Sequence, residues 1–467
     1  MMYSLPRRVV KAVGVTNPRS LLNKKEMQIN LNETDCATFT GKGYIILDFG
    51  KELAGGIRLL SFMITDEKTS IRVRFGESLT ECCAELGERG ACNDHSPRDF
   101  SYPVPFLSDM TLGATGFRFV RIDHLEDKEF QIKNIYAAHE ILNKRALWRY
   151  RGEDRLIAKI FETAKRTVDL CAHRDYVWDG IKRDRLVWIG DMHPEMLSLA
   201  TIYGRLDVVE NSLDMIRNTT PLPGWMNNFP TYSMWWAIII ADYYALTNCR
   251  DFAEKQLDYL EGLMAQANAH VSEEGEMRLP MYFVDWPTKD TADELPGSRA
   301  IMMMAAKKAI ALLSAFGRNT EKAEALLNKL DKVEITVEKM KQVIALKYFA
   351  KGEISDEEYQ KLTEGGAKGM STFMSYYILT AVASRDVALA VSMMKEYYGA
   401  MLDKGATTFW EDFDLAWCEN SGRIDRFPKK GQRDIHGDFG AYCYLGFRHS
   451  LCHGWSSAVI KFIQEHC

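Results

Sequence analysis

The sequence has no long uncharged hydrophobic run, and this absence limits what the protein can be. Nothing in its 467 residues approaches the roughly 18 consecutive apolar residues of a membrane-spanning helix, and the longest candidate, AIIIADYYAL, is interrupted by Asp242. The N-terminal stretch MMYSLPRRVVKAVGV lacks the apolar segment of a signal peptide. We therefore expect no membrane partner and a cytoplasmic location, or a periplasmic or secreted one if an export signal has been trimmed.

Patterns for metal and nucleic-acid binding are also missing. The 10 cysteines are scattered, with no CxxC or Cys/His spacing, so we expect free thiols, no metal and no cofactor. A net charge of −5, with no block of lysine or arginine, argues against nucleic acid as a partner. The sequence leaves the oligomeric state open.

What the sequence does contain is typical of a large globular protein. Apolar residues make up 46% and charged residues 26%, and the length exceeds that of one ordinary core, so we expect at least two domains. Aromatic residues make up 11%, including 10 tryptophans. Many aromatics on a mildly acidic chain favour a neutral, hydroxyl-rich ligand over a polyanion.

The character of the chain changes near residue 145. Before it, short segments rich in Val, Ile, Phe and Tyr are separated by Gly, Asp and Pro: YIILDFG, GIRLLSFMIT, TSIRVRFGE, GFRFVRIDHL and FQIKNIYAA. This pattern predicts a β-sandwich domain over residues 1–145. The polar stretch 81–105 is long for a connection, and is either a plain loop or a contributor to a neighbouring site.

After Leu147 the apolar spacing becomes helical and stays so. It predicts 12 helical segments, among them 192–204, 251–269 and 453–465. Successive helices of even number can pair as antiparallel hairpins that close into a toroid or stack as a solenoid. The segments share no evident sequence identity, which favours a closed barrel over residues 146–467.

One segment, WDGIKRDRLVWIGDMHPE (178–195), is the strongest candidate site. It concentrates carboxylates, basic side chains and two tryptophans without helical or strand periodicity, and Gly180 and Gly190 mark it as a loop before a helix beginning at Met192. Carboxylates and guanidinium groups bind sugar hydroxyls, and indoles pack on the C–H faces of sugars. The segment therefore predicts a saccharide site, with a charged surface loop as the alternative.

Four later residues are weaker candidates, each with an ordinary structural alternative. Trp235 opens an apolar helix and could be core, and Trp286 follows Asp285 in a loop bounded by proline. Glu411 follows Trp410 and could be a solvated charge. His453 has no carboxylate at metal-ligand spacing, which favours a hydrogen-bonding role over metal binding.

Taken in order, these motifs resemble a known family. DGIKRDRLVWIGD, YSMWW, FVDWP, TTFWE and SLCHGW are similar to the catalytic domain of the α-L-rhamnosidases of glycoside hydrolase family 78, and LDFGKELAGGIRL and GFRFVRI resemble the β-sandwich that precedes it. The resemblance covers about residues 40–460. It implies an (α/α)6 barrel, or six-hairpin glycosidase fold, and an inverting hydrolase that releases L-rhamnose from glycosides or polysaccharides.

The resemblance also implies a role for each matching residue. The family's motifs place the proton donor on Asp184, the general base on Glu411, and substrate-binding groups on Asp179, Arg183, Trp188, Asp191, Trp235, Trp286 and His453. Most relatives have Glu at the donor position, so Asp184 is one methylene shorter. Arg183 and Arg185 flank the donor; in an extended segment neighbours face opposite sides, so we expect both to point away from it.

Two alternatives remain. The chain could be a non-catalytic carbohydrate-binding relative in which Asp184 does not reach the glycosidic oxygen. It could also be a six-hairpin glycosidase or lyase acting on another sugar. Many relatives continue into a C-terminal β-domain, where this chain stops soon after its last predicted helix.

Overall fold

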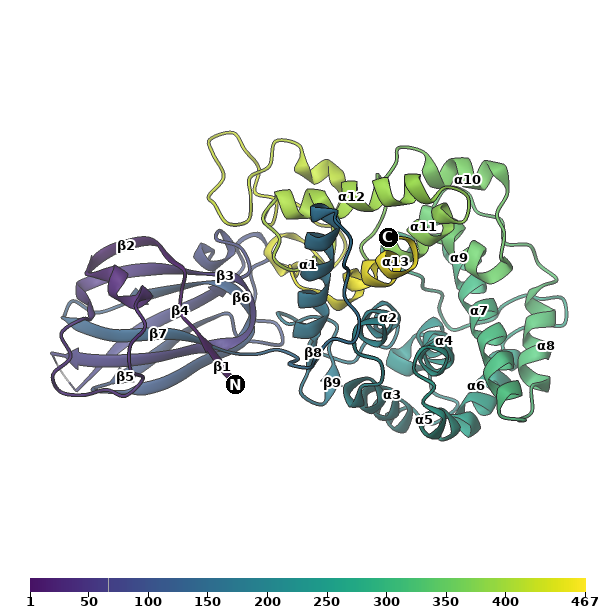
Figure 1. Ribbon diagram of the computed structural model, residues 1–467, viewed down its shortest axis with the longest axis horizontal. Coiled ribbons are helices and arrows are strands. Elements are labelled where there is room, and N and C mark those ends of the chain that lie inside the picture. The colour runs from purple at the N-terminus through teal and green to yellow at the C-terminus, as the bar shows by residue number, and fades with distance from the viewer. Residues whose placement is uncertain (66) are drawn as a thin grey trace.

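The strands and the helices of the protein occupy opposite ends of an elongated molecule. The structure is a computed structural model and describes residues 1–65 and 67–467. The strands lie at the left in Figure 1 and the helices at the right. Most strands precede residue 141, and the first α-helix begins at Arg155, so the change in sequence character near residue 145 coincides with a change in structure.

The N-terminal strands form one antiparallel sheet. Its order is β1-β7-β3-β6-β4-β5, with β2 also paired to β3. The strands are β1 (Met2–Ser4), β2 (Arg8–Thr16), β3 (Ala37–Ile64), β4 (Lys68–Gly76), β5 (Asp99–Pro105), β6 (Asp109–His124) and β7 (Phe130–Glu140). The long strand β3 changes register against β6 after Asp48, and both of its halves contribute to one apolar core that includes Leu47, Leu59 and Phe75.

Three strands of this sheet were not predicted from the sequence. The first two predicted segments are both part of β3, and β1, β2 and β5 are additional. β5 falls inside the stretch 81–105, which was predicted to be a loop, and it contains Pro103 and Pro105. It lies at the edge of the sheet, where proline is tolerated because one side of the strand has no ladder to complete.

The rest of the chain is mainly helical. The helices are α1 (Arg155–Cys171), α2 (Met192–Tyr203), α3 (Asp207–Thr219), α4 (Pro230–Thr247), α5 (Arg250–Glu254), α6 (Leu257–Ala269), α7 (Glu294–Ala315), α8 (Glu321–Leu330), α9 (Lys341–Lys351), α10 (Asp356–Thr363), α11 (Ser375–Ala383), α12 (Val387–Asp403) and α13 (Val459–His466). A short hairpin, β8 (Ala172–His173) and β9 (Tyr176–Val177), follows α1.

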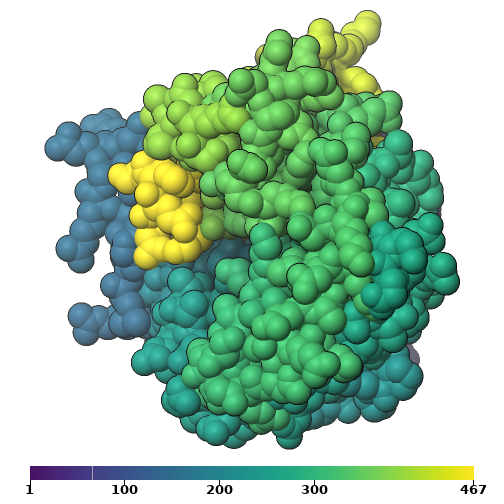
Figure 2. All heavy atoms as spheres, turned by 90° about the vertical axis from the view of Figure 1, so that its right-hand side faces the viewer, coloured from purple at the N-terminus to yellow at the C-terminus, as the bar shows by residue number. Residues whose placement is uncertain are grey.

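Six of these helices contact one another in a closed circle. α2 contacts α4, α4 contacts α7, and the sequence of contacts continues through α9, α11 and α13 back to α2. Every residue of α2 is buried, whereas α3 and α8 bury one face only. The space-filling view shows the teal and green helical segments covering this end of the molecule, with the yellow C-terminal segment beside them (Figure 2).

The predicted helices agree with the structure except at their boundaries. α2 begins at Met192, as predicted. The segment 251–269 is divided into α5 and α6, and 453–465 begins as the 3-10 turn η7 (Gly454–Ser457) before α13. Within the part of the chain that the structure describes, no helix is long and apolar enough to cross a membrane.

The sheet and the helical region are joined by direct polar contacts. Glu52 N donates to Thr407 Oγ1 at 2.9 Å, and Arg118 Nη1 donates to the Gly405 carbonyl at 3.3 Å. The stretch 81–105 also reaches the helical region, because Ser96 Oγ donates to the Lys182 carbonyl at 2.7 Å. The N-terminal region therefore supports the segment that carries the candidate site.

Candidate active site

A cavity of about 80 Å³ brings most of the predicted site residues together. Its lining consists of Asp179, Arg183, Asp184, Trp188, Asp191, Phe229, Tyr232, Phe283, Trp286, Glu411, Cys443, Tyr444, His453 and Trp455. Several lining residues lie at or just before the start of helices in this closed circle: Asp191 directly precedes α2, Tyr232 is in the first turn of α4, and Trp455 lies just before α13. The cavity therefore lies at the end of the closed circle of helices where α2, α4 and α13 begin.

Trp235 lies elsewhere. It is fully buried in α4, with its ring stacked on His193 at 5.3 Å between centroids. The residue of this helix that faces the cavity is Tyr232, whose hydroxyl donates to Asp191 Oδ1 at 3.0 Å. Trp235 is therefore a core residue, in agreement with the alternative interpretation of its sequence context.

The segment around Asp184, the predicted proton donor, is coiled rather than extended. Asp184 and Arg185 both have left-handed backbone conformations, with φ of 56° and 55°. Leu186 N donates to Asp179 Oδ1 at 2.9 Å, so the segment turns back on itself. The alternation of neighbouring side chains expected for an extended chain does not apply here.

The expectation that Arg183 points away from the donor is consequently wrong. Its guanidinium donates to Asp184 Oδ1 at 3.1 Å and to Glu411 Oε1 at 2.5 Å, so one buried cation links the two predicted catalytic carboxyl groups. Arg185 does point away, as expected. It donates to the carbonyls of Ala114 and His95, and it lies over the ring of Trp178.

Glu411 is held by its backbone neighbours as well as by Arg183. Glu411 N donates to the Ser450 carbonyl, and Ser450 N donates back to Glu411 Oε2, both at 2.9 Å. The carboxylate is 3% exposed, and each of its oxygens accepts from a buried donor. Such charge-assisted bonds fix its orientation.

The pKa values of two other acidic groups of the cavity, Asp179 and Asp191, are raised by their surroundings. Burial, and then the charge of Asp191, raise the pKa of Asp179 well above its usual range. Burial raises the pKa of Asp191 as well, against the opposing bond from Tyr232. Burial and the charge of Arg183 lower the pKa of His453 to about 3, so its ring is neutral near pH 7.

The ring of His453 lies close to three of the acidic side chains but forms no hydrogen bond with them. Its Nε2 is 3.7 Å from Asp179 Oδ2 and from Glu411 Oε1, and 3.9 Å from Asp191 Oδ2. These distances exceed those of hydrogen bonds. The polar atoms therefore converge on one space while keeping capacity for the hydroxyl groups of a ligand.

We expect Asp191→Asn to stabilise the protein at neutral pH. Because burial raises the folded-state pKa of this carboxyl above its unfolded value near 3.9, ionisation opposes folding as pH rises through the folded-state pKa. Asparagine keeps an oxygen for the Tyr232 hydroxyl but carries no charge. The gain, about 1–2 kcal/mol in the free energy of unfolding at pH 7, should decline toward pH 4, because Asp191 is protonated in both states only below its unfolded-state pKa.

Thermal unfolding followed by circular dichroism between pH 4 and 8 measures this effect. Asp258→Asn is the matched control, because Asp258 is exposed and pairs only at the surface with Arg318. A gain at pH 7 that does not decline toward pH 4 would contradict the electrostatic explanation.

The remaining walls of the cavity are aromatic. Trp188 packs edge-on against Phe229 and Tyr232, and Phe283 packs edge-on against Trp286. Within the described residues, the indole nitrogen of Trp188 is buried and has no hydrogen-bond partner. A cavity with carboxylates at its base and aromatic rings around it can hold a small ligand that has both hydroxyl groups and an apolar face.

Several site residues were missed by the sequence analysis. Tyr232 and Trp455 belong to motifs that were noticed, YSMWW and SLCHGW, but other residues were chosen from them. Tyr444 had no signal. His95 comes from the stretch 81–105, and its Nε2 is 3.3 Å from Asp184 Oδ1, so this stretch does contribute to the neighbouring site.

One group of side chains has the spacing of a metal site. Among the described residues, Glu77, Glu81 and His436 could bring ligand atoms to one point, and all three are buried. The ammonium group of Lys182 lies 3.1 Å from both glutamates and supplies the positive charge there. The group therefore acts as an ion-pair network.

Comparisons with known proteins were made by sequence and by structure. No family model and no curated protein sequence matches the chain. Solved structures do match. The rhamnosidase from Klebsiella oxytoca, solved with rhamnose bound, is similar with a TM-score of 0.75 and 18% identity, over 99% of this chain and 95% of that one.

Two longer proteins are also similar. The GH78 family rhamnosidase of Bacillus sp. GL1 gives a TM-score of 0.73 at 20% identity, over 96% of this chain and 48% of its own. The α-L-rhamnosidase from Aspergillus terreus gives 0.63 at 16% identity, over 91% of this chain and 52% of its own. This chain spans about half the length of these two relatives.

At these identities the likeness shows a shared fold. The chain is a mixed β and α protein with an N-terminal antiparallel sheet followed by a helical region, and this arrangement is the one found in solved α-L-rhamnosidases. The resemblance seen in the sequence motifs is confirmed at this level.

Proposed function

We propose that the protein is a glycoside hydrolase that releases terminal α-L-rhamnose from glycosides or polysaccharides. The observation that carries this proposal is the single cavity containing Asp184 and Glu411, bridged by Arg183 and enclosed by aromatic rings. The shared fold with α-L-rhamnosidases supports it. In this proposal residues 1–145 are a β-sandwich domain, and residues 146–467 are an (α/α)6 barrel whose inner helices are the six in the closed circle of contacts.

The proposed reaction is hydrolysis with inversion. Asp184 donates its proton to the leaving oxygen as the bond from C1 breaks, and Glu411 takes a proton from the water that forms the new bond to C1. Glu411 suits the base because its two oxygens accept from Arg183 and Ser450, which fixes the orientation of the carboxyl group. Asp179, Asp191 and His453 bind sugar hydroxyls, and the aromatic rings enclose the C–H face and the methyl group of rhamnose.

A non-catalytic sugar-binding protein is the second candidate, and one observation favours it. Arg183 donates to Asp184 as well as to Glu411, so Asp184 Oδ1 is already bonded to a neighbouring side chain and is not free to meet a glycosidic oxygen. For catalysis, a bound glycoside has to take over part of this contact. The two candidates share the cavity and differ in turnover.

We expect turnover of 4-nitrophenyl α-L-rhamnoside, with β-L-rhamnose as the first sugar product in a proton NMR time course. The matched substrate is 4-nitrophenyl α-L-mannoside, which carries a hydroxyl in place of a hydrogen on the methyl group. The aromatic wall should reduce its kcat/KM by about tenfold to a hundredfold.

The outcomes separate the candidates. Tight binding of L-rhamnose in calorimetry without turnover would identify a binding protein. Preference for a different sugar, with neither turnover nor binding of L-rhamnose, would overturn the proposal and leave the fold as the conclusion. Release of α-L-rhamnose as the first product would contradict inversion.

A further inference from the structure

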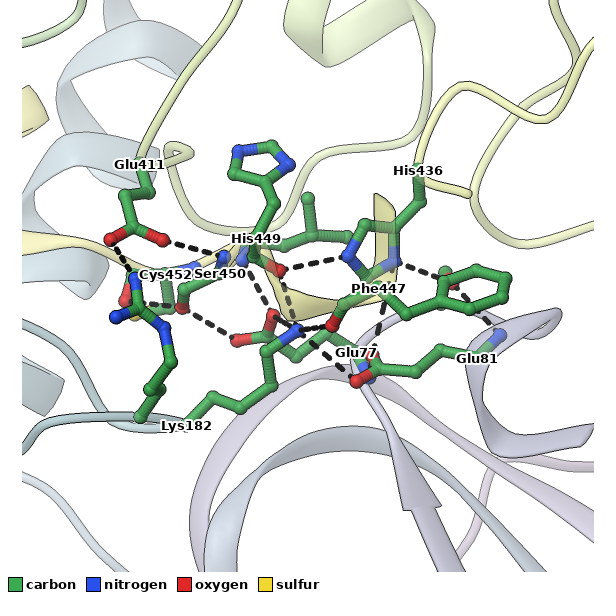
Figure 3. A network of polar contacts seen from close by, with 12 residues as sticks. Glu77, Glu81, Lys182, Glu411, His436, Phe447, His449, Ser450 and Cys452 are labelled. Carbon is green, nitrogen blue, oxygen red and sulfur yellow. Dashed lines mark hydrogen bonds and ion pairs between the residues drawn. The ribbon is translucent and has the colours of Figure 1, made fainter. Parts of the chain in front are cut away.

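A second cluster of charged side chains lies beside the candidate active site, where the sheet meets the helical region. Figure 3 shows Glu77, Glu81 and Lys182 in its lower half, with the ring of His436 to the right and Glu411 to the left. Glu77 directly follows β4, and Glu81 begins the 3-10 turn η2 (Glu81–Cys83). Both glutamates are fully buried, and Lys182 is 8% exposed. Burying three charges is costly unless each is bonded.

Lys182 bonds to both buried glutamates and also to the backbone of the segment on the other side of the cluster. Its ammonium group is 3.1 Å from Glu77 and from Glu81, and it donates to the Phe447 carbonyl at 2.7 Å and to the His449 carbonyl at 2.5 Å. Lys182 directly precedes Arg183. One side chain therefore ties the sheet, the donor segment and the segment 447–453 together.

Glu77 continues this connection to the candidate base. Its Oε2 accepts from Leu451 N at 2.6 Å, and its Oε1 accepts from Ser450 Oγ at 3.1 Å. Ser450 N in turn donates to Glu411 Oε2 (Figure 3). Glu411 N donates to the Ser450 carbonyl. Only one residue, Ser450, separates the buried carboxylate of the sheet from the carboxylate in the cavity.

A neighbouring contact fixes the same segment from the other side. His436 Nε2 bonds to the His449 carbonyl at 2.9 Å, and His436 Nδ1 bonds to Ser78 Oγ at 2.7 Å. His449 Nε2 accepts from Asp412 N at 2.9 Å. Hydrogen bonds therefore hold the segment that orients Glu411 at His449 and at Ser450. Both sets of bonds connect it to the loop after β4, through Ser78 and Glu77.

The geometry points to Glu77 and Lys182 as positioning residues for Glu411. The sheet thereby takes part in catalysis without touching the substrate, by holding the segment 449–451 at the place where Ser450 N aims the Glu411 carboxylate. This inference rests on the proposed function, and it adds a role for the N-terminal region in the chemical step. Catalytic geometry requires such support, because a shift of about 1 Å in a reacting group costs about a hundredfold in rate.

The test is Glu77→Gln, compared with Glu52→Gln. Glutamine at position 77 is neutral and keeps one oxygen in place of two, so its NH2 group faces either Ser450 Oγ or the pair Leu451 N and Lys182 Nζ. The variant therefore loses the charge that pairs with Lys182 and one of the two acceptors that hold the segment. Glu52 is also buried, and burial raises the pKa of both glutamates, that of Glu77 to about 7. Among the described residues, however, Glu52 Oε1 has no hydrogen-bond partner, whereas both oxygens of Glu77 accept hydrogen bonds. Glu52→Gln thus exchanges one neutral buried group for another and leaves the contacts of Glu77 in place.

The measurement is kcat and KM for 4-nitrophenyl α-L-rhamnoside, together with the Kd of L-rhamnose and the melting temperature. We expect Glu77→Gln to lower kcat by about tenfold to a hundredfold while KM and Kd change by less than about threefold, because the groups proposed to bind the sugar do not contact Glu77. Glu52→Gln should retain the wild-type kcat. A general loss of structure would change KM, Kd and the melting temperature together.

Ser450→Ala covers the case in which Glu77→Gln does not fold. It removes the hydroxyl bonded to Glu77 and keeps the backbone N–H bonded to Glu411, so we expect a folded protein whose kcat is reduced about threefold to tenfold with unchanged KM. An unchanged kcat in folded Glu77→Gln, or in Ser450→Ala where the first variant is unfolded, would overturn the inference. Absence of turnover in the wild-type protein would instead overturn the proposed function, so the two failures are distinguishable.

Discussion

Glu411→Gln is expected to lower kcat for 4-nitrophenyl α-L-rhamnoside by about a thousandfold. Glutamine keeps the length of the side chain and an oxygen that accepts from Ser450 N, but it does not take a proton from water. It also removes the anionic acceptor that Arg183 has at this position. The effect should appear in kcat, because the sugar-binding groups on the other walls are unchanged.

The control for this variant is Glu419→Gln, an exposed glutamate on the same stretch of chain and outside the cavity lining. It should have wild-type kinetics. Binding of L-rhamnose to Glu411→Gln, measured by calorimetry, should remain within about tenfold of wild type. A variant that keeps at least a tenth of the wild-type kcat would remove Glu411 from the role of base.

The sequence was sufficient to locate the site because its residues are concentrated in a few short motifs. Asp179, Asp184, Trp188 and Asp191 occur within 13 positions that have no helical or strand periodicity, so a loop rich in binding groups could be predicted. The structure places all four on one cavity. Local composition carried this information without any knowledge of distant contacts.

The direction of individual side chains was much harder to predict. Arg183 faces Asp184 because Asp184 and Arg185 both adopt positive φ. In a sequence, glycine is the main sign of this conformation, and neither position is glycine. In α4, Trp235 and Tyr232 are both buried on an almost uniformly apolar helix. Such a helix has no polar face, so its periodicity does not show which ring faces the cavity.

Contacts between distant segments were not predictable from the pattern at all. His95 lies 89 positions before Asp184, and Glu77 lies 373 positions before Ser450. Nothing in the composition of the N-terminal strands distinguishes Glu77 from a solvated glutamate. Its importance comes only from burial next to Lys182, which folding of the sheet against the helical region creates.

Asp184→Asn is expected to have an effect that depends on the leaving group. An alkyl or glycosyl rhamnoside has a poor leaving oxygen that needs a proton as the bond breaks, so its kcat/KM should fall by about a thousandfold or more. A 2,4-dinitrophenyl rhamnoside departs as a stable anion and needs little protonation. Its kcat/KM should fall by less than about tenfold.

This comparison isolates proton donation from the other contacts of Asp184. The residue also accepts from Arg183 and lies 3.3 Å from His95 Nε2, so a substitution could disturb the cavity without any role in acid catalysis. Such a disturbance would lower the rates for both substrates to a similar extent, whereas loss of the acid separates them. Equal losses for the alkyl and dinitrophenyl substrates would therefore assign Asp184 to binding, and would leave the proton donor to be sought among the other acids of the cavity, Asp179 and Asp191, whose raised pKa values keep them protonated.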